Sequence, residues 1–489
     1  MYSFRKYLPF YKRNLKVAFP VMVTQAGQVV VQLADNIMVG HVGTAELAGV
    51  SFANAIFMIG FVTLIGFSQG LTPLVGESYA KGQHQRASQL LRNSFTLNLL
   101  IYLAAGLLLT GVGFFMPRMG QDPQVVPFAQ TYYFIMLVSL IPSSVFFSAR
   151  FFADGLGDTR HAMWITVASN ILNIFLNWLL IFGHFGLPAL GVTGAAIATL
   201  ISRFFCSGIF VAVLFKARTF SQYAREALTE RIDRQTIAAI SRLSLPIALS
   251  SMLESTAFSF AVIMVGWIGK VELAAHQIAN SLGQLSFMVA CGIGAAATIR
   301  VSHQFGAGRI DDTLMAGRAS VHMGVFYMFA CGLLFVLLRN VLPYAYTSDP
   351  EVVKYASRLI VMLSLYQISD AVQLTSMASL RGLKDTKRPM LYAAMSYYGI
   401  AIPSAYLFAF VFGIGPEGVW LGLLLGLSVA AVLFYHRFHR ICREAARKVI
   451  NKKKILLTPS GTGQGRCHPL QDIQIHRRIS SGAIKSDSP

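Results

Sequence analysis

The two halves of this chain repeat each other at a nearly constant spacing, and both copies are rich in apolar residues. The spacing is 226 or 227 residues, as the differences 263 minus 37 and 382 minus 155 show. Duplicated membrane halves are a common plan of transporters, which hold substrate where the repeats meet, so the repeat favours a transporter. The clearest matches pair Ile37–Gly40 with Ile263–Gly266, Glu46–Ala48 with Glu272–Ala274, and Gly155–Thr159 with Gly382–Thr386.

The composition is that of a membrane protein. Of the 489 residues, 55% are hydrophobic and 13% are charged, whereas soluble domains carry about 25% charged residues. The apolar residues form runs of about 20, the length of a membrane-spanning helix. We therefore predict an all-α integral membrane protein with about twelve transmembrane helices, split evenly between the halves. Their centres are expected near residues 28, 62, 104, 139, 173, 202, 254, 286, 328, 367, 401 and 428.

The net charge of +20 is concentrated in alternate loops. This alternation is the positive-inside pattern, which predicts a multi-pass protein of the inner cell membrane with both termini in the cytoplasm. A nucleic-acid-binding protein would gather its basic residues on one folded surface, so we exclude nucleic acid as a partner. The basic loops include 81–92, 216–242 and 381–388, and the loops without Lys or Arg are 41–47, 183–190 and 413–418.

The repeat and the charge pattern together predict the domain organisation. Each half has an even number of spans, so both begin on the same side and are related by an axis along the membrane normal. Two bundles of about six helices then face each other across a cavity. The expected parts are a cytoplasmic N-terminus (1–13), an N-terminal lobe (14–215), a cytoplasmic linker (216–239), a C-terminal lobe (240–440) and a basic, disordered cytoplasmic tail (441–489).

Three acidic residues lie inside the predicted spans. A carboxylate at the bilayer centre costs on the order of 2.5–3.5 kcal/mol on insertion scales, so such residues are functional by default. Glu254 and Asp370 lie mid-span in the second half, and Asp35 lies in the outer half of the first span. We predict that they bind a coupling cation or the substrate. Duplication does not account for them, because they align with Gln28, Ser143 and Ala261.

Polar side chains accompany Asp35 in the first half. Asn173 and Asn177 are spaced i and i+4, so they project from one face of a helix. Carboxylate and amide oxygens suit a hard cation such as Na⁺ and equally a shared proton. The residues leave both ions open, and also a purely structural role for the asparagines between helices. The candidates for an apolar wall that receives an organic cation are Phe287, Phe151, Phe152, Met288 and Tyr366.

Other functional classes fit the sequence less well. A membrane-embedded enzyme would need a clustered metal motif or a nucleophile with its base, and the cysteines and histidines show no such spacing. We therefore expect no enzyme activity and no cofactor beyond a coupling ion. A channel fits a duplicated chain with unequal acids less well than alternating access does. The main alternative is a flippase of lipid-linked oligosaccharides, which shares the two-lobe plan but would hold pyrophosphate with Arg and Lys.

Four segments together resemble the multidrug and toxic compound extrusion (MATE) family, specifically its NorM-like branch. The similarity spans about residues 14–440, which is both predicted bundles. It implies a V-shaped exporter of small-molecule drugs and organic cations that takes up Na⁺ or H⁺ in exchange. The segments are Asp35–Gly40, Gly66–Gly70, Leu273–Ile278 and Arg381–Thr386.

The resemblance also implies roles for single residues. Glu254 and Asp370 match the cation-binding acids of the C-terminal lobe, and Phe287 matches an aromatic residue that can face the cation. The polar cluster of the N-terminal lobe is matched by Asp35, Asn173 and Asn177. Both clusters together favour Na⁺ over H⁺, with Glu254 and Asp370 as its ligands. The protein is expected to act as a monomer among membrane lipids and to confer antibiotic resistance. The residues expected to contact the exported compound are Asp370, Phe287, Gln277 and Asp35.

Overall fold

The computed structural model describes residues 4–120 and 122–457, and every regular element in these ranges is helical. Two short segments are 3₁₀ helices (η1 and η2), and two are π-helices (η3 and η4). The elements in chain order are α1 (Phe4–Gly40), α2 (Thr44–Ser68), α3 (Leu71–Ala80), α4 (His84–Phe115), η1 (Met116–Arg118), α5 (Val126–Val138), α6 (Leu140–Leu156), α7 (Arg160–Phe182), α8 (Gly191–Lys216), α9 (Arg218–Thr229), α10 (Arg234–Ile268), α11 (Lys270–Gly306), α12 (Ile310–Leu337), η2 (Leu342–Ala345), α13 (Pro350–Gly382), α14 (Lys387–Ala394), η3 (Met395–Ala401), α15 (Ile402–Tyr406), η4 (Leu407–Val411) and α16 (Pro416–Leu457).

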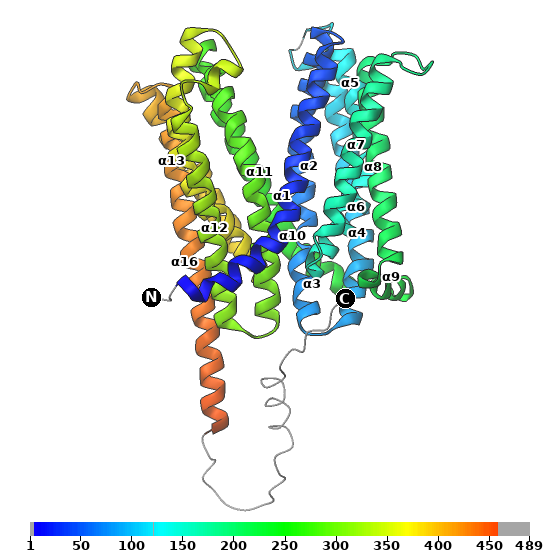
Figure 1. Cartoon of the computed structure of the whole chain (residues 1–489), viewed down its shortest axis with the longest axis vertical. Helices are drawn as coiled ribbons and strands as arrows, with labels where there is room; N and C mark the ends of the chain where they lie inside the picture. The colour runs from blue at the N-terminus through cyan, green and yellow to red at the C-terminus, as the bar shows by residue number, and fades with distance from the viewer. Residues whose placement is uncertain (1–3, 121, 458–489) are drawn as a thin grey trace, which may run out of the picture. The chain divides into compact units, whose positions relative to one another are not determined.

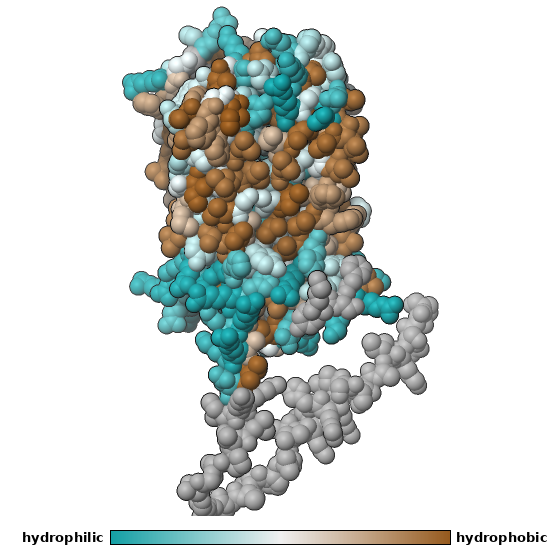
Figure 2. All heavy atoms as spheres, turned by 90° about the vertical axis from the view of Figure 1, so that its left-hand side faces the viewer, coloured by the Kyte–Doolittle hydropathy of each residue, from teal (hydrophilic) through white to brown (hydrophobic). Residues whose placement is uncertain are grey.

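The predicted membrane spans are present in the structure. Ten helical stretches are long and apolar enough to cross a membrane, and the pair α5–α6, bent by 43°, makes an eleventh. The twelfth expected span corresponds to α13, which is 33 residues long but carries Gln367, Asp370 and Gln373. These polar side chains are buried, so α13 turns a polar face into the protein. Figure 2 shows the hydrophobic belt between two hydrophilic ends that a multi-pass membrane protein requires.

The helices form two bundles that diverge from the end at which α1 begins (Figure 1). In one bundle α2 packs on α5 and α7 packs on α8, and in the other α11 packs on α12 and α13. Helix α1 contacts both α7 and α11, and α10 contacts both α2 and α14. The first helix of each half therefore connects the two bundles. We call the end with the loops 81–86, 229–234, 307–309 and 383–388 the basic end.

Glycines let these connecting helices approach the opposite half closely. A Cβ placed on Gly292 would lie 2.8 Å from the backbone nitrogen of Met22, and one on Gly66 would lie 3.3 Å from the Cα of Ala248. The two contacts are copies of each other, because Gly292 and Ala248 follow Gly66 and Met22 by 226 residues. Side chains larger than hydrogen would push α1 and α10 away at these points.

The duplication seen in the sequence extends to individual hydrogen bonds. Thr72 donates its hydroxyl to the carbonyl of Phe151 at 3.1 Å, and Thr298 donates to the carbonyl of Ala378 at 2.9 Å. Both members of the second pair stand 226 or 227 residues after those of the first. The two halves are therefore the same packing unit built twice, as the repeat predicted.

The segments expected to be linker and tail are partly helical. In the linker, α9 buries Phe220 and Tyr223, and the Tyr223 hydroxyl contacts Nδ1 of His84 at 2.7 Å. Burial of this hydroxyl raises the pKa of Tyr223. The structure differs from the expected disordered tail, because α16 runs on to Leu457. Its Ala, Arg, Lys and Leu residues are good helix formers and no proline interrupts them. The rest of the expected tail, 458–489, lies outside the described residues.

Candidate functional site

Glu254 lies on α10 and is held by a side chain from a π-helical segment. The hydroxyl of Tyr397, in η3, donates to Oε1 of Glu254 at 3.1 Å, and Nε2 of Gln373 donates to the same hydroxyl oxygen at 2.9 Å. π-helical turns recur at functional sites because they shift side chains out of regular helical register. Glu254 is partly buried, whereas Tyr397 and Gln373 are almost fully buried.

Asp370 lies on α13 and faces the same group of residues. Its side chain is 3% exposed and it repels Glu254 electrostatically. Tyr366 and Cys291 interact electrostatically with both acids, so they line the same site. Within residues 4–120 and 122–457, no hydrogen-bond donor or cationic side chain contacts the Asp370 carboxylate. The structure thus brings together the two acids that the sequence predicted as a pair.

A pair of buried carboxylates is an incomplete arrangement. Ionised carboxylates only accept hydrogen bonds, and neighbouring ones repel unless a proton or a cation lies between them. Oxygen ligands of this kind fit a hard cation. In the described part of the chain, no group of three or more His, Cys, Asp and Glu residues could hold a metal. A cation at Glu254 and Asp370 would therefore take its remaining ligands from hydroxyl groups, carbonyls or water.

The predicted polar cluster of the first half is assembled around Asn177 on α7. Its amide nitrogen donates both to Oδ1 of Asp35 on α1 and, at 3.2 Å, to Oδ1 of Asn173. Asn173 in turn donates to Oγ1 of Thr199 at 3.4 Å. Asn177 is fully buried, yet its Oδ1 has no hydrogen-bond partner. This unpaired oxygen, next to the Asp35 carboxylate, is a ready ligand for a cation or a protonated group.

Arg203 on α8 was missed by the sequence analysis. Its charge interacts with Asp35, it donates from Nη1 to Oγ of Ser139 at 2.6 Å, and its guanidinium lies 4.6 Å from the centre of the Phe61 ring. A lone Arg inside the apolar run 191–216 was the available signal. Because Arg203 offsets the charge of Asp35, the cluster of the first half is close to neutral, unlike the acid pair.

The aromatic and amide candidates occupy different environments. Phe287 on α11 is partly buried and packs against Ala371, the neighbour of Asp370. Gln277 on the same helix is exposed. Phe152 is fully buried and Phe151 is 8% exposed, both within the main hydrophobic core. These two residues are therefore core residues, and the suggestion that they line a substrate chamber is wrong.

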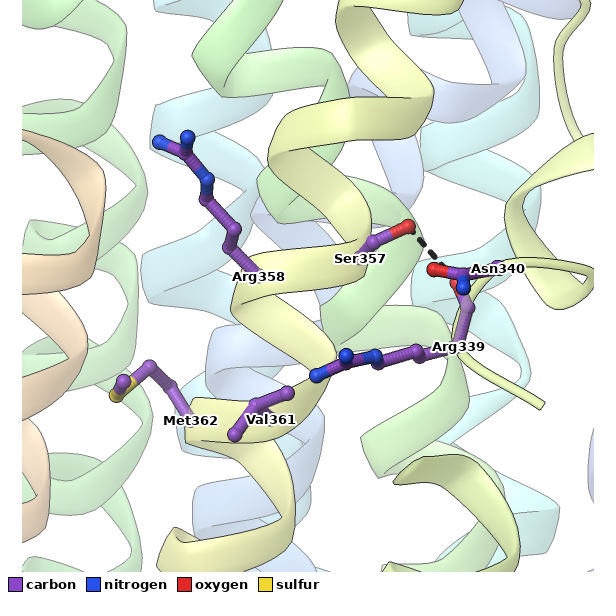
Figure 3. Close-up of a pocket in the computed structure, with 6 residues that line it drawn as sticks. All are labelled: Arg339, Asn340, Ser357, Arg358, Val361 and Met362. Carbon is purple, nitrogen blue, oxygen red and sulfur yellow. Dashed lines mark hydrogen bonds between the residues drawn. The ribbon is translucent and has the colours of Figure 1, made fainter. Parts of the chain in front are cut away.

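A surface pocket of about 390 Å³ lies near the far end of the second half, away from these clusters. Figure 3 shows it between the loop that follows α12 and the first turns of α13. The Ser357 hydroxyl donates to the carbonyl of Arg339 at 2.9 Å, and Arg358 approaches Glu417 at 3.7 Å. None of the candidate residues lines this pocket, which is formed by Arg339, Asn340, Ser357, Arg358, Val361 and Met362.

Comparison with known proteins agrees with the fold and the duplication. The MatE family model matches residues 20–179 and 246–407, once in each half. The probable multidrug resistance protein NorM of Agrobacterium fabrum is 32% identical over 440 residues, which cover 88% of this chain and 93% of that protein. The multidrug resistance protein PmpM of Pseudomonas aeruginosa is 31% identical over 445 residues, which cover 89% and 93%.

Solved structures share the architecture at lower identity. The eukaryotic MATE transporter AtDTX14 superposes with a TM-score of 0.81 at 24% identity, over 91% of this chain and 99% of that chain. An outward-facing multidrug resistance MATE family transporter superposes with a TM-score of 0.83 at 21% identity, over 90% and 97%. With the family model matched in each repeat and relatives above 30% identity along most of its length, this chain belongs to the MATE family of multidrug efflux transporters, which are membrane transporters and not enzymes.

Proposed function

We propose that this protein is a secondary active antiporter that exports amphipathic, often cationic, compounds in exchange for Na⁺ or H⁺. The observation that carries the proposal is the acid pair of the second half, in which the buried Asp370 has no partner among the described residues. A buried carboxylate needs a positive charge beside it or a proton on it. The coupling ion and an organic cation each supply that charge.

The exchange follows from competition for these carboxylates. If cation and drug bind the same acids, or bias them in opposite directions, each displaces the other, and the coupling between them is reciprocal. The basic end is proposed to face the cytoplasm, with both termini there, because Lys and Arg favour that side. Since the bundles meet at the basic end and diverge from it (Figure 1), this structure then represents the outward-facing state.

Na⁺ is the proposed coupling ion, with H⁺ as the alternative. Two separate oxygen-rich clusters support it, the carboxylates of Glu254 and Asp370 and the group of Asp35, Asn173 and the unpaired Oδ1 of Asn177. Carboxylate and amide oxygens are the ligands that hard cations prefer. Phe287, beside Ala371, would offer its ring face to an organic cation, and Gln277 would contact the drug on the same helix. We propose that the transporter acts as a monomer in the inner membrane.

Flipping of a lipid-linked oligosaccharide is the second candidate. Arg203, Arg150 and Arg381 are basic residues inside the helical bundles, which such a function would use to hold pyrophosphate. Each is already engaged: Arg203 with Ser139 and aromatic rings, Arg150 with Asp154 at 3.9 Å, and Arg381 with Gln69 at 2.7 Å. No basic cluster is left to bind an anionic lipid, so drug export is the better supported function.

Efflux from proteoliposomes tests the proposal. A fluorescent organic cation is loaded, and a Na⁺ gradient and a pH gradient are imposed separately at equal ionic strength. We expect one gradient to drive transport and Asp370→Asn to abolish it at unchanged protein level. Glu254→Gln should weaken the stimulation by the cation. Asp312→Asn, at the start of α12, is the matched control and should transport normally. Transport that ignores both gradients, or full activity of Asp370→Asn, would refute the antiporter.

A further inference from the structure

The duplicated motif differs between the halves at two positions, and both differences introduce a basic residue. Residues 154–159 read Asp-Gly-Leu-Gly-Asp-Thr, and residues 381–386 read Arg-Gly-Leu-Lys-Asp-Thr. Asp154 is thus replaced by Arg381, and Gly157 by Lys384. The surrounding packing is conserved between the copies, since Cβ atoms at Gly155 and Gly382 would meet Val75 and Val301, which are also repeat partners. The two basic residues are therefore a departure from an otherwise symmetric unit.

Both basic side chains cross from one half of the protein to the other. Arg381 donates from Nη1 to Oε1 of Gln69 at 2.7 Å, and Lys384 forms an ion pair with Glu77. Lys384 adopts a φ of 62°, in the left-handed region where the first half has Gly157 with a φ of 87°. A lysine in this conformation costs on the order of 1–3 kcal/mol. The strained backbone is retained at the point where the side chain reaches Glu77.

Arg381 also faces the cation site. The groups around its guanidinium are Glu254 on α10, Cys291 on α11, Tyr397 in η3, Gln69 on α2 and the sulfur of Met377, 3.7 Å from Nη2. Glu254 is the one acid in this group, and Nε of Arg381 has no hydrogen-bond partner. The charge of Arg381 is therefore compensated by Glu254, while its hydrogen bond holds the opposite half.

We propose that Arg381 couples the occupancy of the cation site to the closure of the basic end; the proposal rests on the exchange function given above. An ionised, empty Glu254 compensates Arg381, which remains bonded to Gln69 and keeps the halves together. A proton or Na⁺ on Glu254 removes that compensation and leaves a buried guanidinium with mainly neutral partners, which is strongly unfavourable. The basic end then opens and hydrates Arg381. A cation that arrives from outside thus opens the inside, as exchange requires.

The equivalent contact of the other half carries no such link. There Nε2 of His303, the repeat partner of Glu77, donates to the carbonyl of Gly155 at 2.7 Å. Asp154, the repeat partner of Arg381, interacts with Arg150 and Asp158 of its own half and not with the opposite half. The coupling between site and closure therefore belongs to the second half alone, the half that contains the acid pair.

A double-mutant cycle on conformation tests the proposal without transport. The five cysteines are replaced by serine, and spin labels are placed at Gln85→Cys and Asp311→Cys, exposed repeat partners at the basic end. Double electron–electron resonance then gives the open fraction in wild type, Glu254→Gln, Arg381→Gln and the double variant. We expect Glu254→Gln to raise the ratio of open to closed molecules about tenfold. In the Arg381→Gln background the same change should have no further effect.

Several outcomes separate the possibilities. Arg300→Gln, a basic residue on α11 whose charged neighbours are Arg13 and Asp312, is the matched control and should leave the Glu254→Gln effect intact. If Arg381→Gln folds poorly, Arg381→Lys keeps the charge and should keep the response. Additive effects of the two changes, or no opening in Glu254→Gln, would overturn the proposal. A failure of gradient-driven efflux with an intact cycle would instead refute the antiporter and leave the coupling standing.

Discussion

Gly292→Ala should open the basic end by displacing α1 from α11. The added Cβ would lie 2.5 Å from Cγ of Met22, 2.8 Å from its backbone nitrogen and 3.0 Å from the carbonyl oxygen of Ala18. Two of these three atoms belong to the backbone, so a change of rotamer does not relieve the clash. Overpacking of this kind costs about 1–3 kcal/mol. The gain in helix propensity cancels, because α11 stays helical in both states.

This cost falls on the closed state and shifts the equilibrium between closed and open molecules. A difference of 1–3 kcal/mol corresponds to about a 5- to 150-fold change in the ratio. The labels at Gln85→Cys and Asp311→Cys measure that ratio directly. Gly66→Ala, the repeat partner, should have a smaller effect, because its nearest atom is the hydroxyl oxygen of Ser251, which can rotate away.

Two glycines provide the control for this experiment. No heavy atom would lie within 4 Å of a Cβ placed on Gly111 in α4 or on Gly208 in α8. Gly111→Ala and Gly208→Ala therefore add the same methyl group without touching the contact between the halves, and their distance distributions should match wild type. If Gly292→Ala gives the same distribution as these controls, the close approach of α1 and α11 does not hold the basic end shut.

Three further predictions follow from other contacts. Lys384→Gln should raise the open ratio about two- to fivefold, as expected for a partly exposed ion pair, whereas Lys81→Gln should not, because Lys81 contacts Glu77 at 2.7 Å within the same helix region and half; equal effects would argue against a latch between the halves. Asp370→Asn should lower the affinity for a fluorescent organic cation in binding titrations, and unchanged affinity would separate this acid from the drug site. Asp233→Ala should lower the thermal midpoint at neutral pH, because Thr236 and Gln235 donate to this carboxylate at the start of α10 and lower its pKa. Since a lowered pKa stabilises the fold above the unfolded pKa and the effect is lost as the pH falls, the difference from wild type should vanish in acid.

The sequence was sufficient for the fold and for the acidic residues. Apolar runs separated by basic loops define membrane helices because the bilayer penalises unpaired polar backbone and charge. The same penalty made Glu254 and Asp370 conspicuous, and the repeat indicated that they share one half. Their convergence required the structure, since the sequence does not show that Tyr397 reaches Glu254 from a π-helical turn or that Gln373 supports it.

Contacts between the halves were beyond the reach of sequence patterns. Gln69 and Arg381 lie 312 positions apart and carry residue types that are ordinary at helix ends near a membrane surface. The connection of both bundles by α1 and α10 was equally hidden, because apolar periodicity gives the length of a helix and not the half on which it packs. Arg203 was detectable as a lone charge in an apolar run, but its pairing with Asp35 depends on the packing of α8 beside α1.

An exchanger built from two identical halves would lack a reason to respond to its ion in one place rather than another. Here the backbone hydrogen bonds of Thr72 and Thr298 preserve the symmetric scaffold, so both halves can rock about a shared contact. The charges break that symmetry on one side only, with Glu254 in the site and Arg381 between the site and the opposite half. Because a buried charge is costly when its partner is neutralised, this placement turns ion binding into a change of contact between the halves. Moving an acid to the aligned position Gln28 would therefore create a second cation site without a second latch, since Asp154 stands where that latch would need a basic residue.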